Sequence, residues 1–281
     1  MQRIFVGDVQ GCSEELGELL GRAEERFGDG TEYFVVGDLV NRGPGSLSAL
    51  RQIRDLDARR PGRVHYVLGN HEVSLLRCWL GLRAVSPYDS FQDVLDAPDV
   101  DEWMEWLRAR PMAASGRLGE QSFAVVHAGV HPAWSLSDLL DAARAVEAQL
   151  RGPLEELRRY LGGPFAPRDD VLGRLTRCRS VGDEGEWSSD EPADGLRAWH
   201  AAWSERGHDY GVVYGHWAMQ GLHVAPGLRG LDTGCVHHGR GRDGALTAWL
   251  PDPGSARPFD VPDEAFWRIP ARRAYYAHRD R

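Results

Sequence analysis

The sequence predicts an α/β fold that carries a helical insertion. Five short apolar runs rich in Val, Ile, Phe and Tyr are typical of buried strands; they are residues 3–6, 33–36, 64–68, 123–126 and 212–214. Helical patterns separate the first three runs, and the order strand, helix, strand is typical of parallel β-α-β units. Before the fifth run, residues 133–209 are largely of helical periodicity, so we expect them to form an insertion.

The helices between the first strands are predicted from capping and apolar spacing. Ser13 opens the first of them, in which Leu16, Leu19 and Leu20 share one face. The second is predicted over 45–57, where apolar residues again recur at helical spacing. These two helices complete the β-α-β pattern of the N-terminal part.

The rest of the chain has a different order of elements. An amphipathic helix is predicted over 101–110 and ends before Pro111. Within the insertion, the segments 135–151, 154–161 and 199–206 are predicted to be helical and the acidic segment 183–194 to be an exposed loop. Strand character returns over 222–224, 228–231 and 245–250. We expect the tail from Pro251 to be irregular.

The composition predicts one globular domain, residues 1–281, because 42% of the residues are hydrophobic and 27% are charged. The formal net charge of −9 argues against binding to the backbone of DNA, which requires a basic surface. A small anionic substrate remains open, because a metal ion or a few arginines can reverse the local field. The chain has no lysine, which excludes a P-loop and Schiff-base chemistry.

The cysteines and the N-terminus indicate the compartment. The four cysteines form no C-x-x-C pair, so we expect reduced thiols and no structural zinc site. The N-terminus lacks the charged start and apolar core of a signal peptide, and no apolar run approaches the roughly 20 residues of a membrane span. We therefore expect a cytoplasmic protein that has no membrane partner.

Each of the five predicted strands ends in a side chain that can bind a metal ion. These side chains are Asp8 and Gln10, Asp38, Asn70, His127 and His216. In an open α/β sheet, ligands bind beyond the carboxyl ends of the strands, so we expect these residues to converge in one crevice. Carboxylate, imidazole and amide ligands suit Mn, Fe, Co, Zn or Mg, and one aspartate can bridge two ions about 3.5–4 Å apart.

Each of these motifs is weak evidence by itself. A glycine–aspartate pair after a strand is usually a turn, and a lone histidine there is more often a satisfied core residue than a ligand. Ligand-type residues at all five strand ends nevertheless predict a two-metal centre. The chain has two asparagines, Asn41 and Asn70, and both lie in these motifs, which strengthens the prediction.

The order of the motifs resembles the calcineurin-like metallophosphoesterases, a superfamily of β-sandwiches flanked by helices. The motifs are G-D-x-(H/Q)-G, G-D-x-x-x-R-G, G-N-H-E, H-A-G and G-H. More narrowly, G-D-L-V-N-R-G-P-G, V-L-G-N-H-E, T-R-C-R, Y-G-H-W and L-D-T-G-C resemble the bacterial symmetrical bis(5′-nucleosyl)-tetraphosphatases, which are diadenosine tetraphosphatases. The similarity runs from Arg3 to about Leu250.

The resemblance implies a role for each ligand-type residue. It places Asp8 and Gln10 on a first metal ion, Asp38 between two ions, and Asn70, His127 and His216 on the second. The ions are expected to be Mn²⁺ or Co²⁺, with Mg²⁺, Fe or Zn²⁺ as alternatives. The family usually has histidine where this chain has Gln10. Because an amide oxygen is harder and less basic than imidazole, we expect the first ion to be held more weakly or to differ in identity. The alternative is that Gln10 only hydrogen-bonds a metal-bound water.

His71 and Arg42 match the catalytic positions of the family. His71 corresponds to the general acid that protonates the leaving oxygen, and Arg42 to a clamp for phosphate oxygens. Protein phosphatases orient this histidine with a carboxylate, whereas this chain has Asn41, which we expect to accept a hydrogen bond and to leave the pKa of His71 less elevated. Further implied residues are Arg177 and Arg179, for another phosphate or as part of a solvated helix face, and Asp232, as hydrogen-bond partner of a metal-site histidine.

The resemblance implies hydrolysis of dinucleoside tetraphosphates, such as diadenosine tetraphosphate (Ap4A) to two ADP, by a hydroxide that bridges two metal ions. Np4-type caps at the 5′ end of RNA are a further implied substrate. The insertion 133–209 would then be a helical cap over the crevice. The main alternative is a phosphoprotein (Ser/Thr or Tyr) phosphatase, which Asn41 and a cap over the crevice disfavour. The same motifs also leave open a phosphate monoesterase and a binding module that has lost catalysis.

Overall fold

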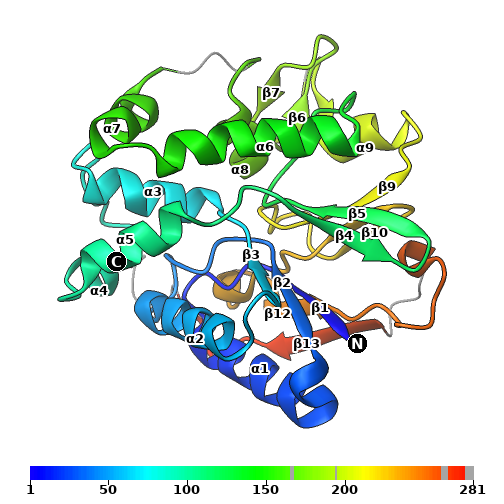
Figure 1. Cartoon of the computed structure of the whole chain (residues 1–281), viewed down its shortest axis with the longest axis horizontal. Coiled ribbons are helices and arrows are strands. Elements are labelled where there is room, and N and C mark those ends of the chain that lie inside the picture. Colours follow the sequence, from blue (N-terminus) through cyan, green and yellow to red (C-terminus); the bar gives the residue numbers. More distant parts are fainter. Residues whose placement is uncertain (165–167, 194, 261–264, 276–281) are drawn as a thin grey trace.

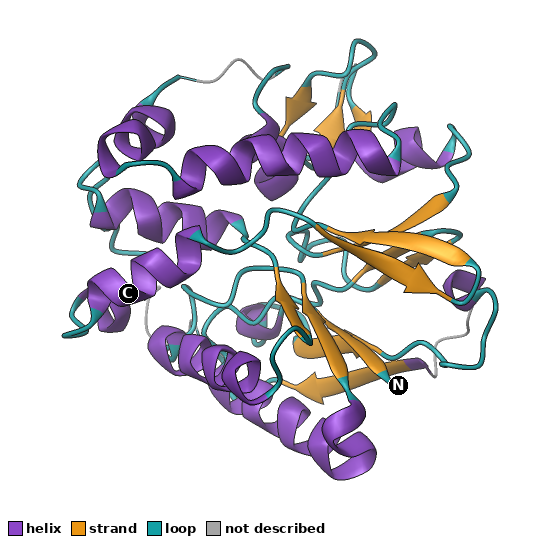
Figure 2. Cartoon of the chain, in the orientation of Figure 1, coloured by secondary structure: helices purple, strands orange, loops and turns teal. Residues whose placement is uncertain are grey.

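The computed structural model describes residues 1–164, 168–193, 195–260 and 265–275. Two five-stranded mixed sheets pack face to face, and helices cover their outer faces (Figures 1 and 2). The first sheet has the order β13 (Phe266–Pro270), β12 (Ala245–Trp249), β1 (Arg3–Val6), β2 (Glu32–Val35), β3 (Val64–Tyr66). The second has the order β10 (His223–Ala225), β11 (Leu228–Gly230), β9 (Tyr210–Tyr214), β5 (Gln121–Val125), β4 (Ala114–Leu118). The predicted α/β sandwich flanked by helices is confirmed.

Successive side chains of the strands point to opposite faces of the sheet and so contribute to two separate hydrophobic cores. β1, β2 and β3 are parallel neighbours, and Phe5 is paired with Phe34. The rings of Phe5 and Phe34 each lie 5.2 Å from the ring of Phe123 in the opposite sheet, so these residues fill the space between the sheets. Their neighbours Ile4 and Val35 point to the other face and join the core beneath α1 (Ser13–Phe27) and α2 (Ser46–Arg59). This period of two is what a strand buried on both faces requires.

The remaining helices lie beside and above the sandwich in Figure 1. α3 (Asn70–Trp79), α4 (Gln92–Leu95) and α5 (Val100–Arg108) lie between β3 and β4 in the chain. The segment between β5 and β9 contains α6 (Leu136–Arg151), α7 (Leu154–Gly162), α8 (Val171–Arg177) and α9 (Trp199–Ser204). α6, α7 and α9 are helices that the periodicity of residues 133–209 predicts, whereas α8 was not predicted. Ser135 caps α6 by accepting a hydrogen bond from the backbone N–H of Asp138. That this segment is a distinct cap stays a prediction.

Three predictions about local structure are wrong. The acidic segment 183–194 contains β7 (Trp187–Ser188), which forms a small antiparallel sheet with β6 (Ser180–Val181) and β8 (Arg197–Ala198). The tail contains the edge strand β13, which pairs antiparallel with β12. The edge strand β4 was not predicted at all. All three are short or lie at a sheet edge, where apolar patterning is weak.

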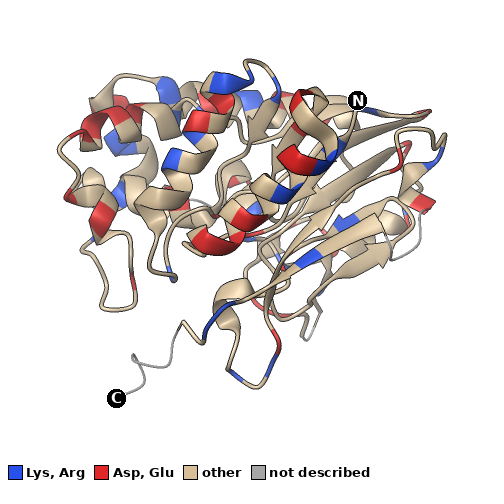
Figure 3. Cartoon of the chain, turned by 90° about the horizontal axis from the view of Figure 1, so that it is seen from below, with Lys and Arg blue, Asp and Glu red and all other residues tan. Residues whose placement is uncertain are grey.

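Charged positions of both signs are interspersed along the helices in Figure 3. Among the helices that the structure describes, none combines the length and apolar character that a membrane span requires.

Candidate active site

The predicted ligand residues lie where the strands of both sheets end. Asp8 follows β1, Asp38 follows β2, and Asn70 begins α3 just after β3. His127 and His216 follow β5 and β9, which are parallel neighbours in the second sheet. Metal-binding atoms of Asp8, Asp38 and His127 lie within 4.8 Å of one another and are buried. The crevice is therefore built from two sheets, not from one open sheet as the sequence suggested.

One ring nitrogen of His127 and one ring nitrogen of His216 face the same atom, Oδ1 of Asn70. Nδ1 of His127 lies 2.9 Å from the carbonyl oxygen of Val36, and Nε2 of His216 lies 3.1 Å from that of Arg177. Because a carbonyl oxygen only accepts, these two nitrogens carry the protons. The opposite nitrogens lie 3.1 Å and 2.9 Å from Oδ1 of Asn70. Histidines held through a backbone carbonyl, with the other nitrogen directed at an oxygen ligand, are typical of metal sites.

Buried carboxylates concentrate negative charge at the same place. Burial, together with the adjacent Asp232 and Asp38, raises the pKa of Asp8 well above its ordinary value. Burial also raises the pKa of Asp232 to about 6. Although burial opposes ionisation of Asp38, the neighbouring His127 and His71 lower its pKa. Several buried acids with so few compensating charges fit bound cations, which would neutralise them.

Asp232 does not have the partner that the sequence suggested. Its Oδ1 accepts a hydrogen bond from the backbone N–H of Gly234 at 3.0 Å. Its Oδ2 is buried and has no hydrogen-bond partner within the described chain, so it does not hold a histidine. Among neighbouring charges, Asp232 has the largest effect on the pKa of Asp8, which places it next to that carboxylate.

Several residues of the site have a positive φ, a backbone conformation that is rare for residues other than glycine. In the described part of the chain, the non-glycine residues with positive φ are Gln10, Asp38, Asn41, Arg42 and His216. All five belong to the motifs at the strand ends. Such conformations cost about 1–3 kcal/mol each and cluster at functional sites. They are a sign of function that does not depend on similarity to any other protein.

At two glycines of the site there is no room for a side chain, whereas their backbone conformation does not require glycine. A Cβ at Gly69 would overlap the carboxylate of Asp38, and a Cβ at Gly215 would overlap that of Asp8. Neither glycine has a positive φ. The sharp turn that glycine would allow is therefore not the reason for glycine at these two positions.

Asn41 donates to His71, which corrects the expectation that it accepts. Oδ1 of Asn41 accepts hydrogen bonds from the backbone N–H groups of Arg42 (2.8 Å) and Ser90 (2.9 Å). Nδ2 therefore faces Nδ1 of His71 and Oδ1 of Asp89, each at 2.9 Å. With Nδ1 accepting, the ring proton of neutral His71 lies on Nε2. Burial lowers the pKa of His71, and the positive charge of Arg42 adds to this, which is the direction that the sequence suggested.

Glu72 is a site residue to which the sequence analysis gave no role. Its carboxylate accepts four backbone hydrogen bonds of 2.8–3.2 Å, from Asp38, Leu39, Val40 and Gly69. These bonds hold the loop that carries Asp38 and Asn41 against the first turn of α3. Its spacing of three residues after Gly69, as in a capping box, is the signal that could have revealed it.

The sequence pattern of the calcineurin-like phosphoesterases matches residues 1–254. A symmetrical bis(5′-nucleosyl)-tetraphosphatase from Janthinobacterium sp. (strain Marseille) is 38% identical over 259 residues, which cover 85% of this chain and 91% of the relative. The chain belongs to the calcineurin-like phosphoesterase family. A symmetrical bis(5′-nucleosyl)-tetraphosphatase from Ralstonia nicotianae is 37% identical, with 84% and 86% of the two chains covered.

Solved structures place this phosphoesterase in the same fold. The crystal structure of a putative diadenosine tetraphosphatase aligns with a TM-score of 0.62 at 25% identity, over 96% of this chain and 93% of that one. A protein serine/threonine phosphatase from Saccharomyces cerevisiae aligns with a TM-score of 0.54 at 15% identity, over 96% and 79% of the two chains. The second likeness concerns the fold alone.

A cavity of about 1250 Å³ lies over the buried acids of this phosphoesterase. Four arginines line it: Arg42, Arg179, Arg240 and Arg242. Arg42 donates to the carbonyl oxygen of Tyr88 at 3.4 Å, and Arg179 to that of Ser189 at 2.7 Å. The side chain of Arg177, in contrast, lines a neighbouring cavity of about 630 Å³ that also contacts His71 and Asn70. The sequence analysis missed Arg240 and Arg242, which follow the L-D-T-G-C motif on an irregular loop.

Proposed function

We propose that this phosphoesterase hydrolyses dinucleoside tetraphosphates symmetrically, so that Ap4A gives two ADP. The observation that carries the proposal is the arrangement of charge: buried acids and histidines form the floor of a cavity whose rim has four arginines. Such a site suits a substrate with several phosphate groups, since metal ions and guanidinium groups both bind phosphate oxygens. The relatives described above, with more than 85% of their length matched, are named for this reaction.

The residues fit two divalent metal ions. Nitrogens of His127 and His216 converge on Oδ1 of Asn70, while Gln10 contacts Asp38 and the charge of Asp232 acts on Asp8. We propose Mn²⁺ or Co²⁺, since these donors are carboxylate, amide and imidazole. When bound, the metal ions would activate a water and stabilise negative charge on the phosphoryl group.

The protein side chains would complete the reaction. Arg42 is proposed to bind a phosphoryl oxygen, because its guanidinium lines the cavity beside His71. His71 lines the same cavity, and its Nε2, which carries the ring proton, lies 3.7 Å from Oδ2 of Asp38, so it is proposed to donate to the leaving oxygen. Asn41 and Glu72 are positioning residues: the first fixes the His71 ring, and the second fixes the loop with Asp38. Cleavage of Np4-type RNA caps and a cytoplasmic location stay predictions.

Product analysis tests this proposal. The purified chain is incubated with Ap4A and Mn²⁺ or Co²⁺, beside His71→Ala and, as a matched control, His65→Ala on the outer part of β3. The expected result is ADP as the sole product, strongly reduced for His71→Ala and retained for His65→Ala. AMP plus ATP would contradict symmetric cleavage. No turnover of Ap4A, with rapid phosphate release from a phosphopeptide, would favour the phosphoprotein phosphatase instead.

A further inference from the structure

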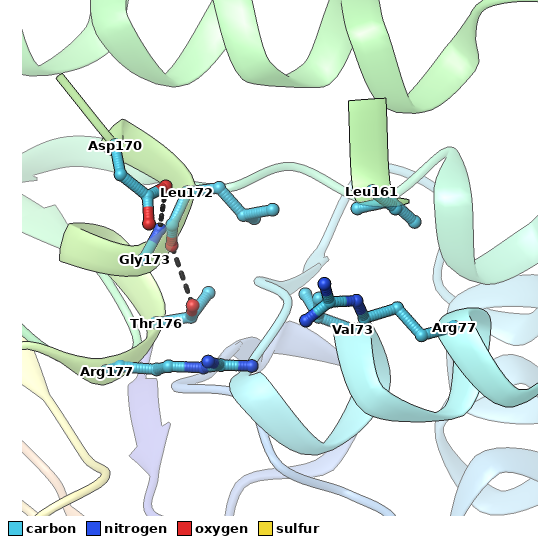
Figure 4. A pocket seen from close by; sticks show the side chains of 8 residues that line it. All are labelled: Val73, Arg77, Leu161, Asp170, Leu172, Gly173, Thr176 and Arg177. Atoms are coloured by element: carbon cyan, nitrogen blue, oxygen red, sulfur yellow. Dashed lines mark hydrogen bonds between the residues drawn. The ribbon is translucent and has the colours of Figure 1, made fainter. Parts of the chain in front are cut away.

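A third, narrower cavity lies along α3, next to the active-site cavities (Figure 4). It is lined by residues of α3, α7 and α8. Arg77 enters it from α3 and Arg177 from the end of α8, and the two guanidinium groups extend toward one another across it in Figure 4. Leu161 and Val73 provide its apolar wall.

The two arginines lack the partners that buried cations normally have. Within the described chain, neither guanidinium forms a hydrogen bond or an ion pair, whereas the nearby Arg83 forms an ion pair of 2.6 Å with Asp89. Both side chains are half-buried. Burial lowers the pKa of Arg177, and the positive charge of Arg77 lowers it further. Two like charges that are partly removed from water repel each other unless an anion lies between them.

No carboxylate of the described residues forms an ion pair with either guanidinium. The carboxylate of Asp170 lines this cavity and its charge acts on both arginines, but its Oδ1 caps α8 by accepting a hydrogen bond from Gly173 at 2.8 Å. Figure 4 shows this bond on the side of the cavity away from Arg77. The remaining hydroxyl, that of Thr176, donates to the carbonyl oxygen of Leu172 at 2.7 Å. An anionic ligand is therefore the partner that fits the two guanidinium groups.

The cavity borders the one at the reacting centre. Arg177 lines both this cavity and the neighbouring one that contacts His71 and Asn70. Arg77 lies six residues after His71 on the same helix, which is about 9 Å along the helix axis. His71, at the start of this stretch of α3, is the residue proposed to protonate the leaving oxygen. An anion held by Arg77 and Arg177 would therefore lie on the leaving-group side of the scissile bond.

We propose that Arg77 and Arg177 form an anion subsite for the phosphate groups of the departing nucleotide. The subsite selects substrates with a long polyphosphate chain over short phosphodiesters. The assignment to a departing nucleotide rests on the proposed function, whereas the anion subsite rests only on the two unpaired guanidinium groups and the cavity between them.

Kinetics with two substrates of different length test the selection. The Mn²⁺-loaded full chain is assayed with Ap4A and with bis(p-nitrophenyl) phosphate, which has no distal phosphate. Arg77→Gln and Arg177→Gln are each expected to lower kcat/KM for Ap4A roughly tenfold or more, the loss of one charge-assisted hydrogen bond, and to leave the small diester within about twofold. Arg77→Lys, which keeps the charge, should recover part of the loss. Equal losses for both substrates, or no loss for either, would overturn the proposal.

Binding without turnover separates the subsite from the proposed reaction. Calorimetric titration of the same Mn²⁺-loaded proteins with ADP, and with inorganic phosphate as a short ligand, is expected to show weaker ADP binding in both glutamine variants and unchanged phosphate binding. Arg144→Gln, an exposed arginine paired with Asp141 on α6, is the matched control and should bind like the unchanged chain. If the chain does not hydrolyse Ap4A but both glutamine variants still bind ADP more weakly than the unchanged chain, the anion subsite is supported and Ap4A is not the substrate. Unchanged ADP binding in both variants rejects the subsite even where Ap4A hydrolysis is confirmed.

Discussion

Gln10 is the residue by which this site departs most from its family. Its Nε2 donates to Oδ2 of Asp38 at 3.3 Å, and its own backbone is held at a φ of 47°. That conformation brings the side chain over the shared carboxylate, where the amide oxygen can reach an ion on the Asp8 side. Imidazole binds transition metals more tightly than an amide oxygen does, so if Gln10 is a ligand, we expect glutamine here to weaken the proposed metal position beside Asp8 and not the other.

Gln10→His should therefore tighten one metal position selectively. We expect the dissociation constant of the weaker Mn²⁺ ion to fall roughly tenfold, since a more basic ligand replaces an amide at an unchanged backbone position. Histidine also tolerates the positive φ better than most residues. Calorimetry with Mn²⁺ measures the two affinities, with Gln10→Ala as the comparison. If histidine gives no gain and alanine no loss, Gln10 contacts only Asp38 and is not a ligand.

At the scale of single elements, α3 organises the site. Its first three residues are Asn70, His71 and Glu72, so one helical turn supplies a proposed ligand, a proposed acid and the carboxylate that anchors the loop after β2. Glu72 accepts four backbone N–H groups, and burial together with the charge of Asp38 raises its pKa to about 7. Glu72 therefore holds the loop that carries Asp38 and Asn41 without contacting substrate itself.

Glu72→Gln should destabilise the fold and the metal site together. The new amide group places N–H donors against backbone N–H donors, which leaves buried groups unpaired and costs about 1–3 kcal/mol in the free energy of unfolding. Urea unfolding measures that loss, and calorimetry with Mn²⁺ measures the accompanying weaker binding. Glu102→Gln, an exposed glutamate on α5, is the control and should change stability by less than about 0.5 kcal/mol. Equal stability of the two variants would show that the four hydrogen bonds do not hold the loop.

Elements with a repeated apolar pattern were predicted well from the sequence. Features that depend on a single strand pairing or a single hydrogen bond were predicted poorly. Apolar strands such as 3–6 and 33–36, and the ligands that follow them, were found because both faces of a central strand are buried. The edge strand β13 escaped prediction, since it is stabilised by pairing with the preceding strand β12 and its own apolar pattern is weak. The direction of the Asn41 amide could not be predicted either, because it depends on a backbone N–H of Ser90, 49 residues away.

At the scale of the whole molecule, the site joins two sheets that are separate in the hydrogen-bond pattern. Asp8 and Asp38 come from the first sheet and His127 and His216 from the second, and Asn70 contacts both histidines. Between the sheets lies an apolar core that includes Phe5, Phe34 and Phe123. The buried acids Asp8, Asp38 and Asp232 at this end of the sandwich repel one another, and cations bound among them would relieve that repulsion.

Metal ions should therefore stabilise the whole fold, and more so at neutral than at acidic pH. Burial raises the pKa of Asp232 to about 6, so near pH 5 this carboxyl holds a proton that an ion must displace, and burial with neighbouring acids shifts the pKa of Asp8 in the same direction. At pH 7.5 Asp232 is ionised, and an ion relieves its repulsion with the neighbouring acids. At a metal concentration 100 times the dissociation constant, binding adds about 2.7 kcal/mol to the free energy of unfolding.

For a chain of this size, that corresponds to a rise in Tm of roughly 5–10 °C at pH 7.5 and to a clearly smaller rise at pH 5. Scanning calorimetry with Mn²⁺ and with a chelator measures both values. The double variant Asp8→Asn/Asp232→Asn should lose most of the rise at pH 7.5, while Asp252→Asn, at an exposed position beyond β12, should keep it. The same rise at both pH values would mean that these two carboxyls are not the groups that the ion neutralises.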